Sequence, residues 1–211
     1  MEVQTEKFNK ETGRDFDTIA KTIFAPVYPV IVDQIVERCG INNGVCIDLG
    51  SGPGHLGIAM ARSYEFKVYG LDFSVDINDI AFKNIKSVGL EGRVELIQGS
   101  VDEMPFNDNF ADVIMSRGSF FFWHDIENAF REIFRVLKPG GKTYIGGGFG
   151  SEKLREQVTS EMLKIDPEWE CHGKRRLGKN NTEKTRVILD NMNLRYTVFD
   201  DETGLWFMIS K

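Results

Sequence analysis

The sequence predicts an α/β fold in which short strands alternate with helices and pair in a mostly parallel sheet. From residue 44 onward, apolar runs of five or six residues alternate with longer segments of helical periodicity. A glycine-rich turn, residues 50–54, separates the first apolar run from the first of these helical patterns. The last two apolar runs are joined by only four residues, 201–204, which makes them antiparallel. We therefore expect parallel strands with right-handed crossovers, followed by a C-terminal hairpin.

Residues 1–43 contain two helical patterns ahead of the first strand. The first ends before Pro26, and the second begins near Pro29 and ends at Gly40. The apolar stripe of the second helix comprises Ile31, Ile35 and Cys39. Ordinary core packing of an added helical pair explains this pattern as well as a cap over a binding site does.

The remaining elements follow in regular order. The expected strands are 44–49, 66–71, 94–98, 111–116, 143–147, 194–200 and 205–210. Helices are expected after the glycine turn, after the N-caps Ser74 and Asp125, over 154–165, and from a Thr182 cap to Met192. Residues 166–181 have little periodicity and are expected to form a loop.

Composition limits the class of protein. The chain has 211 residues, 41% hydrophobic and 27% charged, as expected for one soluble domain. Its net charge of −6 argues against a large nucleic-acid surface, and the basic cluster 174–179 is either a solvated loop or an anion contact. No apolar run is long enough to cross a bilayer, and residues 1–10 lack a signal-peptide core, so we expect a cytoplasmic protein with no membrane partner. Three cysteines without metal-ligand spacing predict no metal site.

The glycine turn carries the strongest chemical signal. Glycines at 50, 52 and 54 let the backbone approach a ligand where a Cβ would clash. A turn of this kind, at the carboxyl end of the first strand, is where open α/β sheets bind nucleotides. Asp48 lies two residues before the turn, where its carboxylate would repel a pyrophosphate. It favours instead a ligand with an ammonium or sulfonium group.

Four ordered segments resemble the class I S-adenosylmethionine-dependent methyltransferases, and together they span about residues 44–147. They are Asp48-Leu49-Gly50-Ser51-Gly52-Pro53-Gly54, Val68-Tyr69-Gly70-Leu71-Asp72-Phe73-Ser74, Gly99-Ser100-Val101-Asp102-Glu103-Met104-Pro105-Phe106 and Arg131-Glu132-Ile133-Phe134-Arg135-Val136-Leu137-Lys138-Pro139-Gly140-Gly141. The sequence is most similar to the small-molecule branch, which includes quinone-biosynthesis methyltransferases. The resemblance implies a Rossmann-like sandwich with a mostly parallel seven-stranded sheet and a C-terminal antiparallel hairpin.

The resemblance also implies a domain organisation. Residues 1–211 would form a single methyltransferase domain, with residues 1–43 as a helical cap over the cofactor. Residues 44–147 would be the cofactor-binding core, 148–193 variable helices with a candidate lid, and 194–211 the hairpin.

S-adenosylmethionine is the cofactor that the resemblance implies. Asp48 and the turn amides around Gly50, Ser51 and Gly52 would face its methionine moiety, while Asp72 would accept hydrogen bonds from the ribose hydroxyls. Phe73 would pack on the adenine, although a core aromatic residue explains it as well. The full set of expected cofactor-binding residues is Asp48, Gly50, Ser51, Gly52, Gly54, Asp72, Phe73, Ser74, Gly99, Ser100, Val101, Ser116 and Arg117.

Ser100 is the main departure from the family pattern. Relatives often have an aspartate at this position to accept the adenine amino group, whereas a serine hydroxyl accepts one hydrogen bond without adding charge. We expect the backbone of Val101 or the side chain of Asp102 to take over this role.

An aromatic segment, residues 116–125, follows the fourth expected strand. It lacks the Asn/Asp-Pro-Pro-aromatic motif of amino-directed nucleic-acid methyltransferases, which argues against DNA as a substrate. Some of its rings are expected to line the acceptor pocket. His124 is the candidate general base, since histidine titrates near neutrality, although a surface role explains it as well. The alternative bases are His172, Tyr28 and Asp125.

The predicted function is S-adenosylmethionine-dependent methylation of a small molecule by in-line displacement. Two alternatives stay open: methylation of RNA or protein, with RNA disfavoured by the acidic charge, and a non-catalytic cofactor-binding regulator. A nicotinamide oxidoreductase is opposed by Asp48 and by the C-terminal hairpin.

Overall fold

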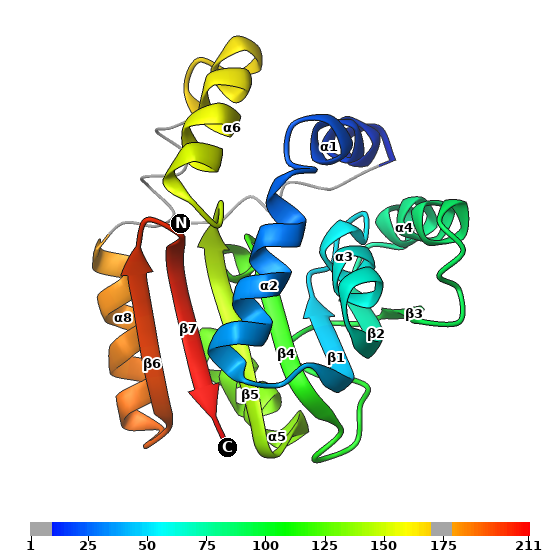
Figure 1. Ribbon diagram of the computed structural model, residues 1–211. Helices are drawn as coiled ribbons and strands as arrows, with labels where there is room; N and C mark the ends of the chain where they lie inside the picture. The colour runs from blue at the N-terminus through cyan, green and yellow to red at the C-terminus, as the bar shows by residue number, and fades with distance from the viewer. Residues whose placement is uncertain (1–9, 170–178) are drawn as a thin grey trace.

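The computed structural model describes residues 10–169 and 179–211, which form one sheet covered on both faces by helices (Figure 1). The strands are β1 (Asn43–Leu49), β2 (Glu65–Asp72), β3 (Val94–Gln98), β4 (Ala111–Arg117), β5 (Leu137–Gly148), β6 (Arg195–Asp201) and β7 (Gly204–Ser210). The helices are α1 (Lys10–Thr22), α2 (Val27–Cys39), α3 (His55–Ser63), α4 (Val75–Ser87), α5 (Ile126–Val136), α6 (Glu152–Ile165) and α8 (Lys179–Asn191), with a short 3-10 turn, η1, at Phe120–Phe122.

The sheet has seven strands in the order β3-β2-β1-β4-β5-β7-β6. The first five in the chain pair in parallel, whereas β7 pairs antiparallel with both β5 and β6. This confirms the predicted fold class, including the C-terminal hairpin. Because β1 and β4 are neighbours although they are far apart in sequence, the strand order reverses between them, and such a switch point is where α/β sheets form their binding crevice.

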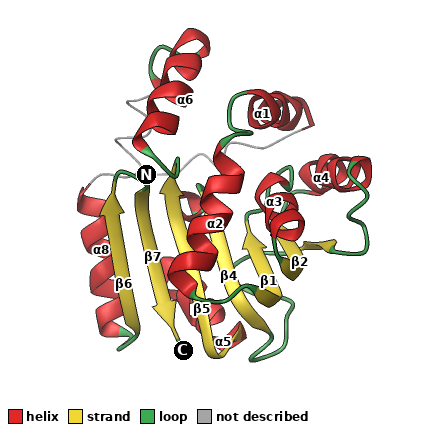
Figure 2. Ribbon diagram, viewed as in Figure 1, coloured by secondary structure: helices red, strands yellow, loops and turns green. Residues whose placement is uncertain are grey.

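Helices cover both faces of the sheet (Figure 2), and the buried residues form two hydrophobic cores. On one face, α2 and α3 pack side by side and supply buried residues such as Ile31 and Met60. On the other face, α5 and α8 are in contact and bury residues such as Phe130 and Leu189. The predicted stripe Ile31, Ile35 and Cys39 is buried, at 0–1% exposure, as expected for a helix packed on a sheet.

Helix α1 lies beyond the carboxyl ends of the central strands and contacts α4 rather than the sheet (Figure 1). Among the described residues, no single helix is long and apolar enough to span a membrane. The helix pair Gly13–Thr22 and Val27–Cys39 has the necessary length and composition only when the two are taken together, and the two helices are bent by 79° relative to each other.

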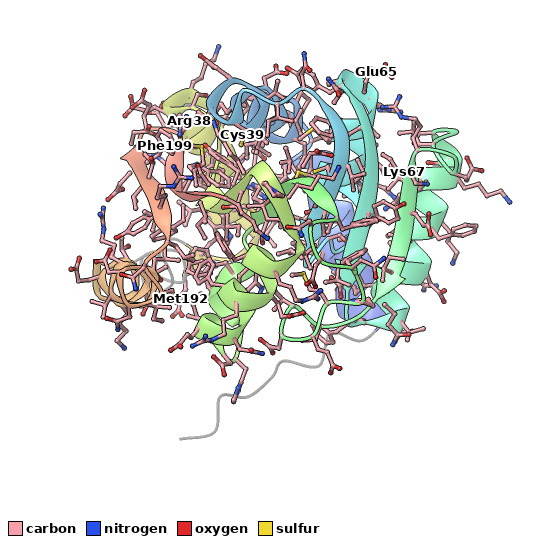
Figure 3. The ribbon with its side chains drawn as sticks, turned by 90° about the horizontal axis from the view of Figure 1, so that it is seen from below. Arg38, Cys39, Glu65, Lys67, Met192 and Phe199 are labelled. Carbon is pink, nitrogen blue, oxygen red and sulfur yellow. The ribbon has the colours of Figure 1, made fainter. Side chains whose placement is uncertain are left out.

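The C-terminal end of α2 is joined to the hairpin through Arg38. Its Nη1 donates to the Tyr144 hydroxyl at 2.9 Å and its Nη2 donates to the Asp201 carboxylate at 2.9 Å. The guanidinium carbon also lies 4.2 Å from the ring centroid of Phe199, beside which Figure 3 labels it. These contacts fix one end of α2 against β5 and β6.

Two predicted element boundaries are wrong. β5 begins at Leu137, not at residue 143, because Gly140 at φ +81° lets the chain bulge and keep pairing with β4. α8 begins at Lys179, so Thr182 lies inside the helix and is not its cap. The start of the second helix near Pro29 is confirmed: α2 begins at Val27, and Pro29 lies in its first turn, where a missing amide hydrogen costs nothing. The N-caps Ser74 and Asp125 are confirmed, since their side chains accept from Ile77 N and Asn128 N.

Candidate active site

The carboxyl ends of three adjacent strands bring the main predicted site residues to one edge. Asp48 on β1 pairs with Gly70 on β2 and with Met115 on β4. Asp72 and Arg117 each lie two residues beyond those partners, at the ends of their strands. The parallel register therefore places the three ionisable side chains along the same edge of the sheet.

The glycine turn is packed tightly against the segment after β4. Gly50 has φ +62°, and a Cβ on it would lie 2.3 Å from the Cβ of Ser119. The Ser119 hydroxyl donates to Leu49 O at 2.8 Å and lies 2.6 Å from the hydroxyl of Ser116, which is fully buried. Ser116 thus joins β4 to the turn through Ser119. Only glycine fits at position 50, because both its conformation and its neighbour exclude a side chain.

The turn amides make hydrogen bonds within the protein. The amides of Gly50 and Ser51 donate to Leu71 O at 2.8 and 3.1 Å, and the amide of Gly52 donates to the Asp72 carboxylate at 3.0 Å. All three amides therefore already have partners within the protein, whereas the sequence predicted that they face the ligand. Their hydrogen bonds tie the end of β1 to the end of β2 and hold the turn open.

Asp48 is an almost fully buried carboxyl group, 2% exposed. It accepts one hydrogen bond, from Gly57 N at 3.1 Å. Burial raises its pKa to about 7, against this hydrogen bond, and the nearby Asp72 adds to the rise. A cation bound beside Asp48 would stabilise the ionised form, so this environment suits the sulfonium or ammonium group of the expected donor.

Asp72 and Phe73 lie together at the end of β2. The Asp72 carboxylate accepts from Gly52 N and Ser74 N, both at 3.0 Å, and burial raises its pKa despite these hydrogen bonds. A carboxylate can accept about four hydrogen bonds, so capacity remains for a ribose hydroxyl beside the backbone amides that already donate to it. Phe73 is 68% exposed, which excludes the core role and leaves its ring open for stacking.

The segment Gly99–Asp102 continues this edge beyond Asp72. The Ser100 hydroxyl is exposed and accepts from Asp102 N at 3.2 Å. The Asp102 Oδ1 atom is buried and has no hydrogen-bond partner among the described residues. An unpaired buried acceptor is costly and is therefore a candidate partner for a ligand donor such as the adenine amino group. Val101 is partly buried beside it.

A polar network that sequence reasoning missed pins α1 to the glycine turn. His55, the first residue of α3, lies with its Nε2 2.8 Å from Asp17 Oδ1 on α1. Asp17 also accepts from Lys21 Nζ at 2.6 Å and from Asn84 Nδ2 at 2.8 Å. Burial would raise the pKa of Asp17, but these three hydrogen bonds outweigh burial and lower it. The one sequence signal was the position of His55 directly after the last glycine of the turn.

The ring of Tyr28 stacks on His55, with centroids 5.6 Å apart. Burial lowers the pKa of His55, against the effect of Asp17, so its ring is neutral at neutral pH. With Nε2–H donated to Asp17, the Nδ1 atom keeps its lone pair and can accept a proton. His55 therefore has the protonation state and the orienting partner of a general base.

The predicted bases differ in their surroundings. His124 is exposed, and Asp125 uses its carboxylate to cap α5. Burial raises the pKa of Tyr28 to about 12, so its phenol keeps its proton at neutral pH. His172 lies outside the described residues.

Arg117 extends from the end of β4 toward the junction of α1 and α2. Its guanidinium carbon lies 4.9 Å from the ring centroid of Phe24 and 5.7 Å from those of Tyr28 and Phe149. Its Nε donates to Gly148 O at 3.0 Å. Three aromatic rings from two separate segments, the α1–α2 junction and the residue after β5, thus surround the cation at the acidic edge of the sheet.

The described cysteines take no part in this site. Cys39 and Cys46 are buried, and burial raises the pKa of Cys39 to about 12 and that of Cys46 as well. Both thiols are therefore protonated and unreactive. In the described ranges, no group of three or more His, Cys, Asp or Glu side chains is arranged to hold a metal ion.

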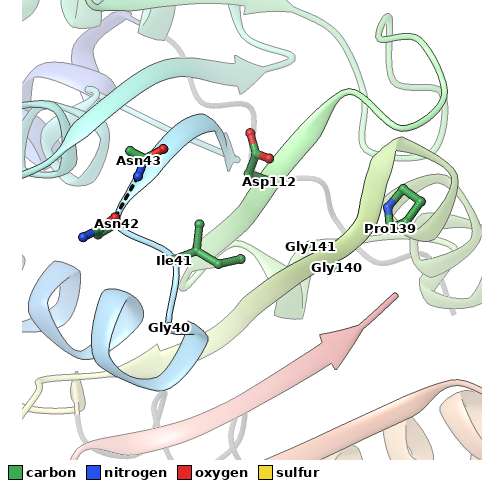
Figure 4. Close-up of a pocket in the computed structure, with 8 residues that line it drawn as sticks. All are labelled: Gly40, Ile41, Asn42, Asn43, Asp112, Pro139, Gly140 and Gly141. Atoms are coloured by element: carbon green, nitrogen blue, oxygen red, sulfur yellow. Dashed lines mark hydrogen bonds between the residues drawn. The ribbon is translucent and has the colours of Figure 1, made fainter.

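An open pocket lies at the opposite, amino-terminal edge of the central strands (Figure 4). It is lined by Gly40–Asn43, Asp112 and Pro139–Gly141. Its carboxylate is already committed, because Asp112 Oδ2 accepts from Val45 N and pairs with Lys138 Nζ, both at 2.7 Å. We therefore place the functional site at the carboxyl edge.

Comparisons with known proteins agree with this geometry. The methyltransferase domain family matches residues 47–145. The crystal structure of a candidate S-adenosyl-L-methionine-dependent methyltransferase from Methanococcus maripaludis superposes with a TM-score of 0.95 and 45% identity, covering 100% of this chain and 97% of that one. The uncharacterized methyltransferase YdaC of Bacillus subtilis (strain 168) is 31% identical over 129 residues, which are 60% of this chain and 69% of that relative. A demethylmenaquinone methyltransferase of Lactobacillus johnsonii is 35% identical over 130 residues, 61% of this chain but only 50% of that protein.

Proposed function

Since the chain belongs to the class I S-adenosylmethionine-dependent methyltransferases, we propose that it methylates a small molecule bound between the α1–α2 junction and the end of β4. One observation carries the proposal: the ring of Tyr28 lies between His55, at 5.6 Å from its ring centroid, and Arg117, whose guanidinium carbon is 5.7 Å away. The whole chain acts as a single catalytic domain in this proposal, with residues 1–43 as the cap and 148–193 as variable helices with a candidate lid.

The size and character of this space favour a small acceptor. The buried Asp17 network fastens the cap to α3 and α4, and the ring of Tyr28 lies on His55 beneath it. The chain has an acidic net charge of −6, which disfavours a long polyanion such as RNA. The quinone acceptor named for the Lactobacillus johnsonii relative is itself a small molecule.

The bound donor supplies the methyl group, and the residues of this chain position it. Asp72 would hold the ribose, Phe73 the adenine, and Asp48 the positive charge of the methionine moiety. The alignment of nucleophile, methyl carbon and sulfur supplies much of the acceleration, because it removes the entropy cost of bringing them together.

Where the acceptor must lose a proton, His55 would remove it through Nδ1, with Asp17 holding the ring in the required tautomer. Positioned general bases contribute roughly 100- to 10,000-fold to such steps. His124 stays the alternative base, and its exposed position at the end of the aromatic segment allows it to reach an acceptor only from the solvent side.

Methyl transfer from labelled S-adenosylmethionine into a fractionated cell extract tests the proposal. The purified protein is incubated with an extract separated into a low-molecular-weight fraction and an acid-precipitable fraction. We expect label in the low-molecular-weight fraction with the wild type and none with Asp72→Asn, the matched control that should lose donor binding.

Label in the acid-precipitable fraction would contradict a small acceptor, and its removal by ribonuclease or by protease would identify RNA or protein instead. Tight binding of S-adenosylhomocysteine without label in either fraction would support the non-catalytic binding protein.

A further inference from the structure

The guanidinium of Arg117 is a cation without a matching anion in the described part of the chain. A guanidinium has five N–H donors, of which one is used, on Gly148 O. No ion pair joins Arg117 to a described carboxylate. Burial lowers the pKa of Arg117. The neighbouring Tyr28 keeps its proton and therefore does not neutralise the charge of the guanidinium. A partly buried charge without a counter-ion is costly, so this guanidinium is a candidate site for an anion.

The surrounding rings fix where that anion can bind. Phe24, Tyr28 and Phe149 each approach within 6 Å of the guanidinium carbon and restrict its orientation. Phe24 and Phe149 also pack on Trp169, at centroid distances of 6.4 and 5.9 Å. These rings restrict the access of water to the partly buried guanidinium, and reduced solvation strengthens a charge-assisted hydrogen bond made beside them.

The place of Arg117 along the sheet separates it from the nucleotide end of the donor. Asp72, which would bind the ribose, ends β2, whereas Arg117 ends β4, with β1 between them. Two strand spacings amount to about 10 Å. The three rings around Arg117, moreover, lie outside residues 47–145, which match the family: Phe24 and Tyr28 precede this segment and Phe149 follows it. Arg117 therefore faces the side from which an acceptor approaches the methyl group.

We propose that Arg117 binds an oxyanion of the methyl acceptor, a carboxylate or a phosphate, through the free edge of its guanidinium. The inference rests on the proposed function and narrows it: the substrate is an anionic small molecule, held by the fork-shaped donor pair that suits planar or tetrahedral oxyanions. It also changes the expected role of Arg117 from cofactor binding to acceptor binding.

The test is a titration of acetate and, separately, inorganic phosphate into protein saturated with S-adenosylhomocysteine. The Arg117 Nε–H resonance is followed by NMR, and Arg117→Gln, Arg117→Lys and Arg38→Gln are titrated in parallel by calorimetry. We expect saturable binding to the wild type, a loss of about tenfold or more in Arg117→Gln, a smaller loss in Arg117→Lys, and wild-type affinity in Arg38→Gln, whose guanidinium is already paired.

A second arm distinguishes the acceptor from the carboxylate tail of the donor itself. S-adenosylhomocysteine and its decarboxylated analogue are titrated into the wild type and Arg117→Gln. Equal S-adenosylhomocysteine affinity in both proteins supports the proposal. If Arg117→Gln weakens only S-adenosylhomocysteine, the donor tail is the anion and the proposal is overturned.

Absence of saturable anion binding in the wild-type complex, or unchanged binding in Arg117→Gln, would also overturn it. Failure of the wild type to bind S-adenosylhomocysteine at all would instead contradict the proposed function, and the same titrations reveal it.

Discussion

At each end of α2 an arginine lies against aromatic rings, but the two arginines differ in their partners. Arg38 donates to Tyr144 and Asp201 and stacks on Phe199, so its charge is paired inside the fold. Arg117 also stacks on rings, but its one hydrogen bond to a described residue is to the carbonyl of Gly148. The comparison separates a cation that fastens elements together from a cation that is held ready for a ligand.

The same contrast extends to the groups around each end. The Arg38 end joins α2 to the hairpin through contacts that are complete within the chain (Figure 3). The Arg117 end gathers Asp48, whose pKa is raised to about 7, and His55, whose pKa is lowered. Variants at the first end should therefore change stability, and variants at the second should change binding and chemistry.

His55→Gln is expected to have the largest effect, a fall in kcat of about 100-fold or more, because the amide can keep the hydrogen bond to Asp17 but cannot accept a proton. The measurement is the pH profile of methyl transfer with the identified acceptor, alongside a thermal melt. The exposed His124→Gln is the matched control and should behave as the wild type. Full turnover with an unchanged pH profile in His55→Gln would remove His55 from the chemistry.

Asp48→Asn should weaken S-adenosylmethionine about 30-fold or more, because it removes the carboxylate that faces the positive moiety. Calorimetry measures the affinity. In the ligand-free protein the variant should gain stability relative to the wild type as pH rises. The pKa of Asp48 is about 7 in the folded protein and 3.8 in the unfolded chain. As pH rises through this range, the unfolded chain loses the proton more readily than the folded protein does, so the free energy of unfolding of the wild type falls. Unchanged donor affinity would contradict the role of Asp48.

Arg38→Gln should lower the free energy of unfolding by about 1–3 kcal/mol, since Asp201 and Tyr144 lose a charged partner. Arg117→Gln, the same substitution at the other end of α2, should leave stability unchanged or increase it, because it removes an uncompensated charge. Urea unfolding of both variants gives the comparison. Equal destabilisation would mean that both arginines serve the fold alone.

The smallest predicted effect is the pH dependence of donor binding. Raising the pH from 6 to 8 ionises Asp48 and should strengthen S-adenosylmethionine binding about tenfold, with proton release on binding at pH 6. Calorimetry in buffers of different ionisation enthalpy measures both quantities. Asp48→Asn serves as the control and should show a flat profile. A wild-type affinity independent of pH would show that Asp48 is ionised before the donor arrives.

The parallel core and the ends of its strands could be predicted because each depends on local signals. Apolar runs, the glycine turn and the caps at Ser74 and Asp125 act within a few residues, and the structure has them where they were expected. The start of β5 could not be predicted, because the bulge at Gly140 forms only against β4.

The polar contacts of the site depend on tertiary structure and could not be predicted from the sequence. Asp17 and His55 are separated by 38 positions and meet only because α1 folds over the turn. The amides of Gly50 and Ser51 were assigned to the ligand because the carbonyl of Leu71, their actual acceptor, belongs to another strand. Arg117 was recognised by position, but the three rings around it come from segments that the family motifs do not include.

The most direct test of the central claim is a crystal structure of the complex with S-adenosylhomocysteine. We expect the ribose hydroxyls to bind the Asp72 carboxylate and the adenine to stack on Phe73. We expect the sulfur to lie above Gly50 beside Asp48, and the free N–H groups of Arg117 to have no contact with the ligand. Ribose bound away from Asp72, or the homocysteine carboxylate seated on Arg117, would contradict it.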